Sequence, residues 1–180
     1  MRRLTNEPHD SLAPSWSRDG RWLYFGSNRS GSWQIWKMPA EGGEPLPVTK
    51  DGGYEAWEAV DGQSIFYNKQ GFWNFGLFQL SLAGGAENKV LDLPQLESFS
   101  DWTITAEGIY YIQRYEGGKP ADPVTIKFFN FATRESKTIA PLEHDPTSNP
   151  GLNISGDGRW FIYSIDDYRN FDIMLVENFH

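Results

Sequence analysis

A chain of 180 residues with a formal net charge of −8, 16% aromatic residues and no cysteine is expected to form one domain or one repeat array without disulfides. The lack of cysteine also excludes a thiolate zinc site and a cysteine nucleophile. The acidic charge argues against a nucleic-acid surface, which needs clustered lysine and arginine, and against binding to an anionic membrane. Aromatic residues favour strands, and the 18 glycines and 11 prolines favour turns, so the composition predicts an all-β fold.

The N-terminal residues 1–6 are basic, yet no apolar stretch follows them, so no signal peptide is predicted. No segment approaches the ~20 apolar residues that a membrane helix requires. We therefore expect a soluble chain without membrane insertion, which is cytoplasmic, or periplasmic if it belongs to a longer protein.

Self-similarity divides the chain into four units, and each is expected to form one blade of a β-propeller. The approximate blades are residues 11–50, 51–92, 93–140 and 141–180. The spacings between the marker glycines are 42, 46 and 50 residues for Gly20, Gly62, Gly108 and Gly158. A period of about 40–45 residues is typical of a four-stranded propeller blade. In each unit the step ending in this glycine is expected to turn the first strand into the second.

Apolar columns repeat through the four units and predict how the strands face one another. The second strands share the columns Leu23, Ile65, Ile109, Phe161 and Phe25, Tyr67, Tyr111, Tyr163. The third strands share the columns Ile35, Leu77, Ile126, Ile173 and, on the opposite face, Met38, Leu80, Phe129, Val176. Strands that are apolar on both faces are expected where each sheet is sandwiched between neighbours.

Short fourth strands are expected at residues 47–49, 89–91 and 137–139, whereas the fourth unit ends before one. Residues 1–6 are therefore expected to complete the last blade and to remove its open edge. Two closures stay open: one chain forms a four-bladed ring, or two chains form an eight-bladed ring as a homodimer. Two insertions, residues 114–123 and 141–150, are expected to be the longest loops.

The first unit carries a recognisable repeat motif. Residues 14–29 read Pro-Ser-Trp-Ser-Arg-Asp-Gly-Arg-Trp-Leu-Tyr-Phe-Gly-Ser-Asn-Arg and continue at 32–36 with Ser-Trp-Gln-Ile-Trp. This stretch resembles a TolB-like, or WD40-like Pro-Asp (PD40), β-propeller repeat. The resemblance extends over the four units and is strongest in the first and fourth. It weakens in the second, where Ala59 and Val60 precede Asp-Gly, and in the third, where Glu107 replaces the Asp.

The resemblance implies a scaffold. Similar repeats occur in TolB, which binds partner proteins, in sensory regions of bacterial regulators, and in propellers that gate prolyl-oligopeptidase-like peptidases. We therefore expect a non-enzymatic propeller that binds a protein or a small-molecule ligand, either by itself or as the sensory or interaction part of a larger bacterial regulator or TolB-like protein. Two alternatives stay open: a carbohydrate-active or other hydrolase with carboxylates at the propeller mouth, and a self-assembling propeller fragment without its own activity.

Glu58 is a candidate site residue because it interrupts an apolar column. It aligns with Trp16, Ile104 and Ile154 on the innermost strand. An acid in such a position must reach water, find a partner or change its pKa. It either lines the central channel, or its carboxylate caps neighbouring backbone or pairs with an arginine.

The segments that precede the innermost strands are expected to cluster at one mouth of the ring. They comprise residues 7–13, 51–55, 95–101 and 145–151. The binding candidates chosen by this position are His9, Asp10, Tyr54, Glu55 and Asp101. No histidine spacing fits a metal site, so neither a metal nor a cofactor is expected, and no catalytic residue is assigned.

Overall fold

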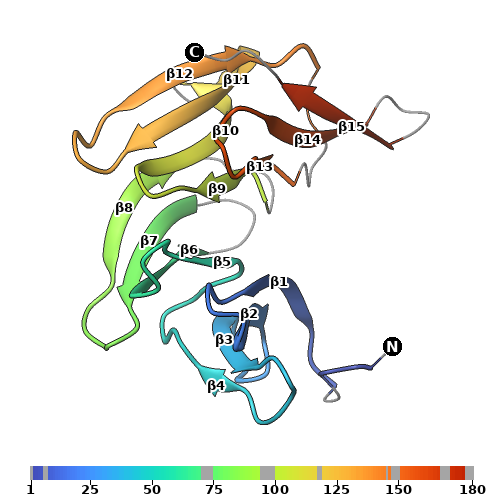
Figure 1. The fold of residues 1–180 in the computed structure, drawn as a ribbon, viewed down its shortest axis with the longest axis vertical. Helices are drawn as coiled ribbons and strands as arrows, with labels where there is room; N and C mark the ends of the chain where they lie inside the picture. The colour runs from blue at the N-terminus through green and yellow to red at the C-terminus, as the bar shows by residue number, and fades with distance from the viewer. Residues whose placement is uncertain are drawn as a thin grey trace. The chain divides into compact units, whose positions relative to one another are not determined.

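The computed structural model of the chain describes residues 2–5, 8–69, 75–93, 100–116, 119–144, 146, 151–166 and 171–176. Every regular element in these residues is a β-strand, as the composition predicts. The strands form four antiparallel sheets (Figure 1). The chain divides into two compact units, Met1–Leu93 and Pro94–His180, and each unit holds two of the sheets.

The sheets of the first unit each contain four strands paired in chain order. The first sheet consists of β1 (Ser11–Trp16), β2 (Trp22–Ser27), β3 (Gln34–Pro39) and β4 (Leu46–Pro47). The second sheet consists of β5 (Ala56–Glu58), β6 (Ser64–Lys69), β7 (Phe75–Ser81) and β8 (Asn88–Leu93).

The sheets of the second unit follow the same order. The third sheet consists of β9 (Trp102–Ile104), β10 (Gly108–Glu116), β11 (Lys119–Asn130) and β12 (Ser136–Pro141). The fourth sheet consists, within the described residues, of β13 (Asn153–Ile154), β14 (Phe161–Asp166) and β15 (Phe171–Val176).

A side-chain network builds the Asp-Gly turn between β1 and β2. Ser17 Oγ and the backbone N–H of Arg21 donate to Asp19 Oδ1 at 2.7 and 2.9 Å, and Arg21 Nε donates to Asp19 Oδ2 at 2.6 Å. Gly20 has a φ of 71°, a left-handed conformation that glycine adopts at little cost. Every residue of this Ser-Arg-Asp-Gly-Arg sequence except Arg18 thus takes part in the turn, Gly20 through its backbone conformation and the others through hydrogen bonds.

The turn of the fourth sheet is built in the same way. Ser155 Oγ and the backbone N–H of Arg159 donate to Asp157 Oδ1 at 2.6 and 3.2 Å, and Arg159 Nε donates to Oδ2 at 2.7 Å. Gly158 again has a φ of 71°. The strong motif resemblance of the first and fourth units therefore corresponds to an identical local structure.

Within the first unit the two sheets pack face to face. Tyr24 and Ile35 of the first sheet lie in one core cluster with Ile65 and Tyr67 of the second, and all four side chains are at most 1% exposed. Burying a side chain of this size contributes about 1.5–3 kcal/mol. We call the face of a sheet that meets the next sheet in the chain its trailing face, and the opposite face its leading face.

The second unit repeats this packing. Ile112 and Ile126, on the trailing face of the third sheet, lie in one cluster with Phe161, Tyr163 and Ile165 on the leading face of the fourth. All five side chains are at most 7% exposed. The predicted apolar columns are therefore the contact surfaces between consecutive sheets inside each unit.

The column that begins with Ile35 is buried in three sheets and exposed in the fourth. Ile35, Leu77 and Ile126 are 0% exposed, whereas Ile173 is 80% exposed. That both faces of every sheet are covered stays a prediction.

The insertion at residues 114–123 is mostly not a loop, contrary to prediction. β10 continues to Glu116 and β11 begins at Lys119, with Tyr115 opposite Pro120. A proline is tolerated there because the pairing of β12 with β11 starts only at Thr125, so the missing N–H of Pro120 leaves no bond to β12 unmade. Half of the second insertion, residues 145 and 147–150, lies outside the described residues.

Residues 2–5 form no strand in this structure. Arg2 Nη2 donates to the carbonyl oxygen of Glu41 at 2.7 Å, beside the turn between β3 and β4. The pairing of residues 1–6 with the last sheet, and the closure of a ring, stay predictions.

Candidate functional site

Three segments of the first unit meet at one end of its two sheets. They are residues 8–10 before β1, residues 28–33 between β2 and β3, and residues 48–55 before β5. In antiparallel sheets the start of one strand lies beside the end of its neighbour, so the 28–33 loop stands next to both of the other segments.

The 28–33 loop is tied to the first of these segments through Asp10. The backbone N–H of Asp10 donates to Asn28 Oδ1 at 3.0 Å, and Asn28 Nδ2 donates to Asp10 Oδ2 at 3.2 Å. Ser27 Oγ donates to the Asp10 carbonyl oxygen at 2.7 Å. Asp10 therefore has a positioning role in this loop, while the neighbouring His9 is exposed at the same edge.

The other side of the 28–33 loop is tied to Tyr54. Its ring stacks on Trp33 with centroids 5.1 Å apart and planes 26° apart, and both side chains are half-buried. Gly26 lets the Tyr54 backbone approach, since a Cβ at this position would overlap the Tyr54 carbonyl oxygen. Within the loop, the Arg29 guanidinium lies 5.2 Å from the ring centroids of both Phe25 and Trp36.

Glu55 and Glu58 are both buried in this structure. Glu55 is 3% exposed, and its backbone N–H donates to Asn68 Oδ1 at 2.8 Å. Glu58 is 7% exposed, and its carboxylate accepts hydrogen bonds from the backbone N–H of Arg18 and, at 3.3 Å, from the Tyr24 hydroxyl. Burial raises the pKa of Tyr24, and the Glu58 charge raises it further.

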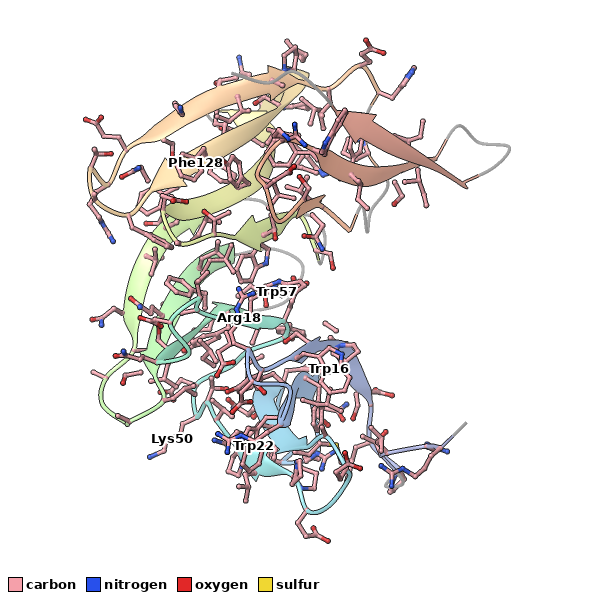
Figure 2. All side chains as sticks on the ribbon, viewed as in Figure 1. Trp16, Arg18, Trp22, Lys50, Trp57 and Phe128 are labelled. Carbon is pink, nitrogen blue, oxygen red and sulfur yellow. The ribbon has the colours of Figure 1, made fainter. Side chains whose placement is uncertain are left out.

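Arg18 completes this contact between the two sheets. Its side chain extends from the end of β1 toward the second sheet (Figure 2) and donates through Nε to the Glu58 carbonyl oxygen at 3.2 Å. Of the two interpretations of Glu58, the carboxylate that caps neighbouring backbone has a direct structural basis here.

Asp101 belongs to the second unit and is fully buried there. Its Oδ1 lies 3.3 Å from Arg114 Nη2 in an ion pair, and Arg114 Nη1 donates to the Pro146 carbonyl oxygen at 2.9 Å. Arg114 thus links Asp101 and Pro146. Most of the predicted mouth segments 95–101 and 145–151 lies outside the described residues.

A pocket of about 290 Å³ opens in the first unit between residues 48–51 and the second sheet. Its lining comprises Val48, Thr49, Lys50, Asp51, Tyr67, Leu80, Gly85, Ala86 and Glu87. On its wall the Glu87 carboxylate accepts hydrogen bonds from Tyr67 Oη and Lys69 Nζ. Burial raises the pKa of Glu87, but these two bonds outweigh it and leave the pKa below its ordinary value.

The sequence did not point to Trp33, Lys69 or Glu87. None of them belongs to a repeated pattern in the sequence. Each acts through a residue of another strand or segment, and the spacing of residues along the chain does not reveal such a contact. The part of the chain that the structure describes contains no group of three histidine or acidic side chains arranged to hold a metal ion. It also contains no helix long and apolar enough to cross a bilayer.

No protein-family model matches the chain. Over 55 residues it is 40% identical to an uncharacterised protein of Agrobacterium fabrum, a match that covers 31% of this chain and 18% of that protein. The solved structure of the putative TolB from Agrobacterium tumefaciens is similar over 98% of this chain and 61% of that one, with 19% identity and a TM-score of 0.71. The fold is that of TolB-like β-propellers.

Two further solved structures have the same fold. TolB from Acinetobacter baumannii gives a TM-score of 0.68 at 17% identity, over 92% of this chain and 40% of that one. An oligogalacturonate lyase in complex with manganese gives a TM-score of 0.62 at 18% identity, over 92% of this chain and 49% of that one. The chain thus spans between 40% and 61% of these structures, and identities this low show the fold alone.

Proposed function

We propose that the chain is a non-enzymatic binding module, and that its first unit binds a protein or small-molecule ligand where the 28–33 loop, the 48–55 segment and the pocket adjoin. This proposal rests on one observation: the 28–33 loop is held by contacts on both sides and lies beside the polar pocket. TolB-like propellers, whose fold this chain has, supply such scaffolds.

The fixed loop supports binding because ordering a loop on association costs free energy. The Asp10–Asn28 hydrogen bonds and the Trp33–Tyr54 stack hold the loop in place without a ligand. Immobilising a rotamer-rich side chain on binding costs about 0.5–1.5 kcal/mol, so a pre-ordered surface binds more tightly than a loose one.

The chemistry of the surface suits an amphipathic ligand. Trp33 and Tyr54 offer half-buried aromatic rings, and Lys50 and Asp51 offer exposed charges of both signs at the pocket. Aromatic residues contribute large contact areas with few rotatable bonds and are enriched in binding sites. A peptide segment or a small molecule with an apolar ring and a polar group fits this description.

The candidate carboxylates support binding over hydrolysis. A glycosidase needs two carboxyl groups that face its substrate. The Glu58 carboxylate instead holds Arg18 and Tyr24, and the Asp101 carboxylate is paired with Arg114 in the other unit. These acids stabilise sheet contacts, and catalysis through them would require breaking those contacts.

NMR screening of a library of small aromatic and polar fragments against the ¹⁵N-labelled chain tests the proposal. We expect hits that shift the amide signals of Thr49, Gly52 and Tyr54, and at least a 10-fold weaker affinity for Trp33→Ala. Trp22→Ala is the matched control, because Trp22 begins β2 at the opposite end of the same sheet. Hits that map elsewhere, or bind Trp33→Ala equally well, would contradict the proposed site.

Turnover would overturn the binding interpretation altogether. The chain is incubated with a panel of glycosides that includes oligogalacturonides, and the products are analysed. We expect no product above background. Turnover that a single carboxylate change such as Glu58→Gln abolishes would establish the hydrolase alternative instead.

A further inference from the structure

The pocket of the first unit has one wall that is fixed by Gln34. The Gln34 side chain, 7% exposed, donates through Nε2 to the Lys50 carbonyl oxygen at 3.0 Å. Its Oε1 accepts from the Gly52 backbone N–H and from Thr49 Oγ1, both at 2.9 Å. Thr49 Oγ1 in turn accepts from the Ile35 backbone N–H at 2.8 Å. Both ends of a buried amide thus hold residues 49–52 in place, and this wall needs no ligand to order it.

The opposite wall carries a carboxylate that is also fixed by hydrogen bonds. Glu87 accepts from the Tyr67 hydroxyl through one oxygen and from Lys69 Nζ through the other. The Lys69 side chain is 12% exposed, and its ammonium also lies 4.8 Å from the Phe78 ring centroid, so it is held against the second sheet. The Glu87 side chain is 30% exposed. Because a carboxylate oxygen can accept two hydrogen bonds, each Glu87 oxygen can accept one more.

A second carboxylate lies at the same end of the pocket. Asp51 is exposed, and within the described part of the chain its carboxylate has neither a hydrogen-bond donor nor an ion-pair partner. Burial raises the pKa of Tyr67, and its bond to Glu87 and the charges of Glu87 and Asp51 raise it further, so both carboxylates lie near its hydroxyl. The Lys50 side chain extends outward from the ribbon (Figure 2). Lys69 offsets only one of the two negative charges, so this end of the pocket stays negative.

The rest of the pocket is apolar and small. Val48, Leu80 and Ala86 line it, and Val48 and Leu80 pack against the core cluster that contains Tyr67. The pocket volume of about 290 Å³ lies at the lower limit of the range of about 300–1,000 Å³ for small-molecule sites. The space therefore suits one small molecule with a single apolar part, and not a peptide of several residues.

We propose that the pocket binds a small organic cation, a primary amine on an apolar body, with its ammonium group between Asp51 and Glu87. The inference rests on the binding function proposed above and adds the charge of the ligand. An ammonium group has three donors and no acceptor, so both carboxylates can accept from it. Hydrogen bonds between charged groups are about twice as strong as neutral ones. The apolar body lies against Val48 and Leu80, where it leaves water.

Ligands of other charge lack these partners. A carboxylate in the same place would face Asp51 and Glu87, because the nearby Lys69 ammonium is already bonded to Glu87 and Lys50 extends outward. A neutral alcohol has only one O–H to donate. The pocket should therefore prefer an amine to an alcohol or an acid of the same shape.

NMR titration of the ¹⁵N-labelled full chain with three probes of similar shape tests the proposal. The probes are phenethylamine, phenethyl alcohol and phenylpropionate, which near neutral pH are positive, neutral and negative. We expect the amine to shift the amide signals of Thr49, Gly52 and Tyr54 and to bind about 10-fold more tightly than either other probe. Added salt should weaken binding of the amine and leave the alcohol unchanged, because salt screens charge attraction.

The Asp51→Asn variant removes the charge of Asp51 and keeps its size. It should weaken binding of the amine about 5-fold and leave the affinity for the alcohol unchanged. Asp61→Asn is the matched control, because Asp61 is also exposed and also precedes a glycine, but it lies in the turn between β5 and β6 outside the pocket lining. This control should bind all three probes as the wild type does.

Two results would overturn the inference and leave the proposed binding surface standing. One is an affinity for the amine no higher than that for the alcohol or the acid, with shifts at the same amides. The other is binding of the amine at these amides that Asp51→Asn leaves unchanged. If none of the three probes shifts these amides, the inference is wrong as well, and the fragment screen described above decides whether the binding surface itself is correct.

Discussion

Glu58 shows how one acidic residue can serve the contact between two sheets. Its carboxylate accepts from Arg18 and Tyr24 at a position where the aligned residues are apolar. Replacing Glu58 with alanine leaves these buried donors without an acceptor, so we expect a loss of about 1–3 kcal/mol in the free energy of unfolding. Urea unfolding followed by tryptophan fluorescence measures this loss.

The Tyr24→Phe variant distinguishes the contribution of the Tyr24 hydroxyl to stability from that of the Glu58 carboxylate. It removes one donor and leaves the Glu58 carboxylate bound to Arg18, so it should cost less than Glu58→Ala, about 1 kcal/mol. Wild-type stability in Glu58→Ala would show that the carboxylate does not hold the two sheets together.

The hydrogen bonds of Asp19 and Asp157 in their turns should make the stability of the fold depend on pH. Hydrogen bonds from Arg21 and Ser17 lower the pKa of Asp19 to about 2, and those from Ser155 and Arg159 lower the pKa of Asp157 to about 2. Because the folded pKa lies below the unfolded value of 3.8, their contribution is fully present above that pH and is lost as the pH falls toward 2.

Thermal unfolding between pH 5 and pH 2 checks the contribution of these turns. The double variant Asp19→Asn with Asp157→Asn should melt at a lower temperature at pH 5 and should lose less stability on acidification than the wild type. Asp61→Asn is the control, because Asp61 accepts only a backbone hydrogen bond from Gln63 among its described contacts. An equal acid-induced loss in the double variant and the wild type would contradict the assignment.

At the scale of the strand, Gly26 sets how closely β2 approaches the segment before β5. A Cβ there would overlap the Tyr54 carbonyl oxygen, and backbone cannot move as easily as a flexible side chain. Gly26→Ala should therefore lower the free energy of unfolding by about 1–3 kcal/mol. Gly156→Ala is the matched control, because nothing lies within 4 Å of its added methyl group.

Chemical denaturation measures the free energy of unfolding of the Gly26→Ala and Gly156→Ala variants. Gly156→Ala should change stability by less than about 0.5 kcal/mol or raise it slightly. Equal losses in both variants would mean that the close approach at Tyr54 does not limit the packing of the first two sheets.

The strands and turns were largely predictable from the sequence because their signals are local. The Asp-Gly steps lie where β1 meets β2 and β5 meets β6, and the apolar columns have the period of two that strands require. The extension of β10 and β11 was missed because Gly117-Gly118 and Pro120 indicate a loop. A strand tolerates a proline where no neighbouring strand pairs with that side of it. Whether β11 has such a neighbour at Pro120 depends on where β12 begins to pair, and β12 is distant in sequence.

The candidate site was less predictable because its contacts join different sheets. Asp10 and Tyr54 lie just before β1 and β5, and their position along the chain was the basis for choosing them. It could not show that Asp10 binds Asn28 or that Tyr54 stacks on Trp33, since both partners come from the loop between β2 and β3. Residue type alone likewise could not decide whether Glu58 faces a channel or the backbone of Arg18.

At the scale of the whole chain, one arrangement of strands is repeated in each sheet. In every sheet the second strand lies between two hydrogen-bonded neighbours, and its apolar column packs on the adjoining sheet where one is present.

Hydrogen–deuterium exchange measured by mass spectrometry tests this arrangement most directly. Slow exchange should recur in the second strand of each sheet, β2, β6, β10 and β14, with faster exchange in the turns that precede them. Uniformly fast exchange across one of these strands, or protection concentrated in the segments between sheets, would contradict a chain of repeated, face-packed sheets.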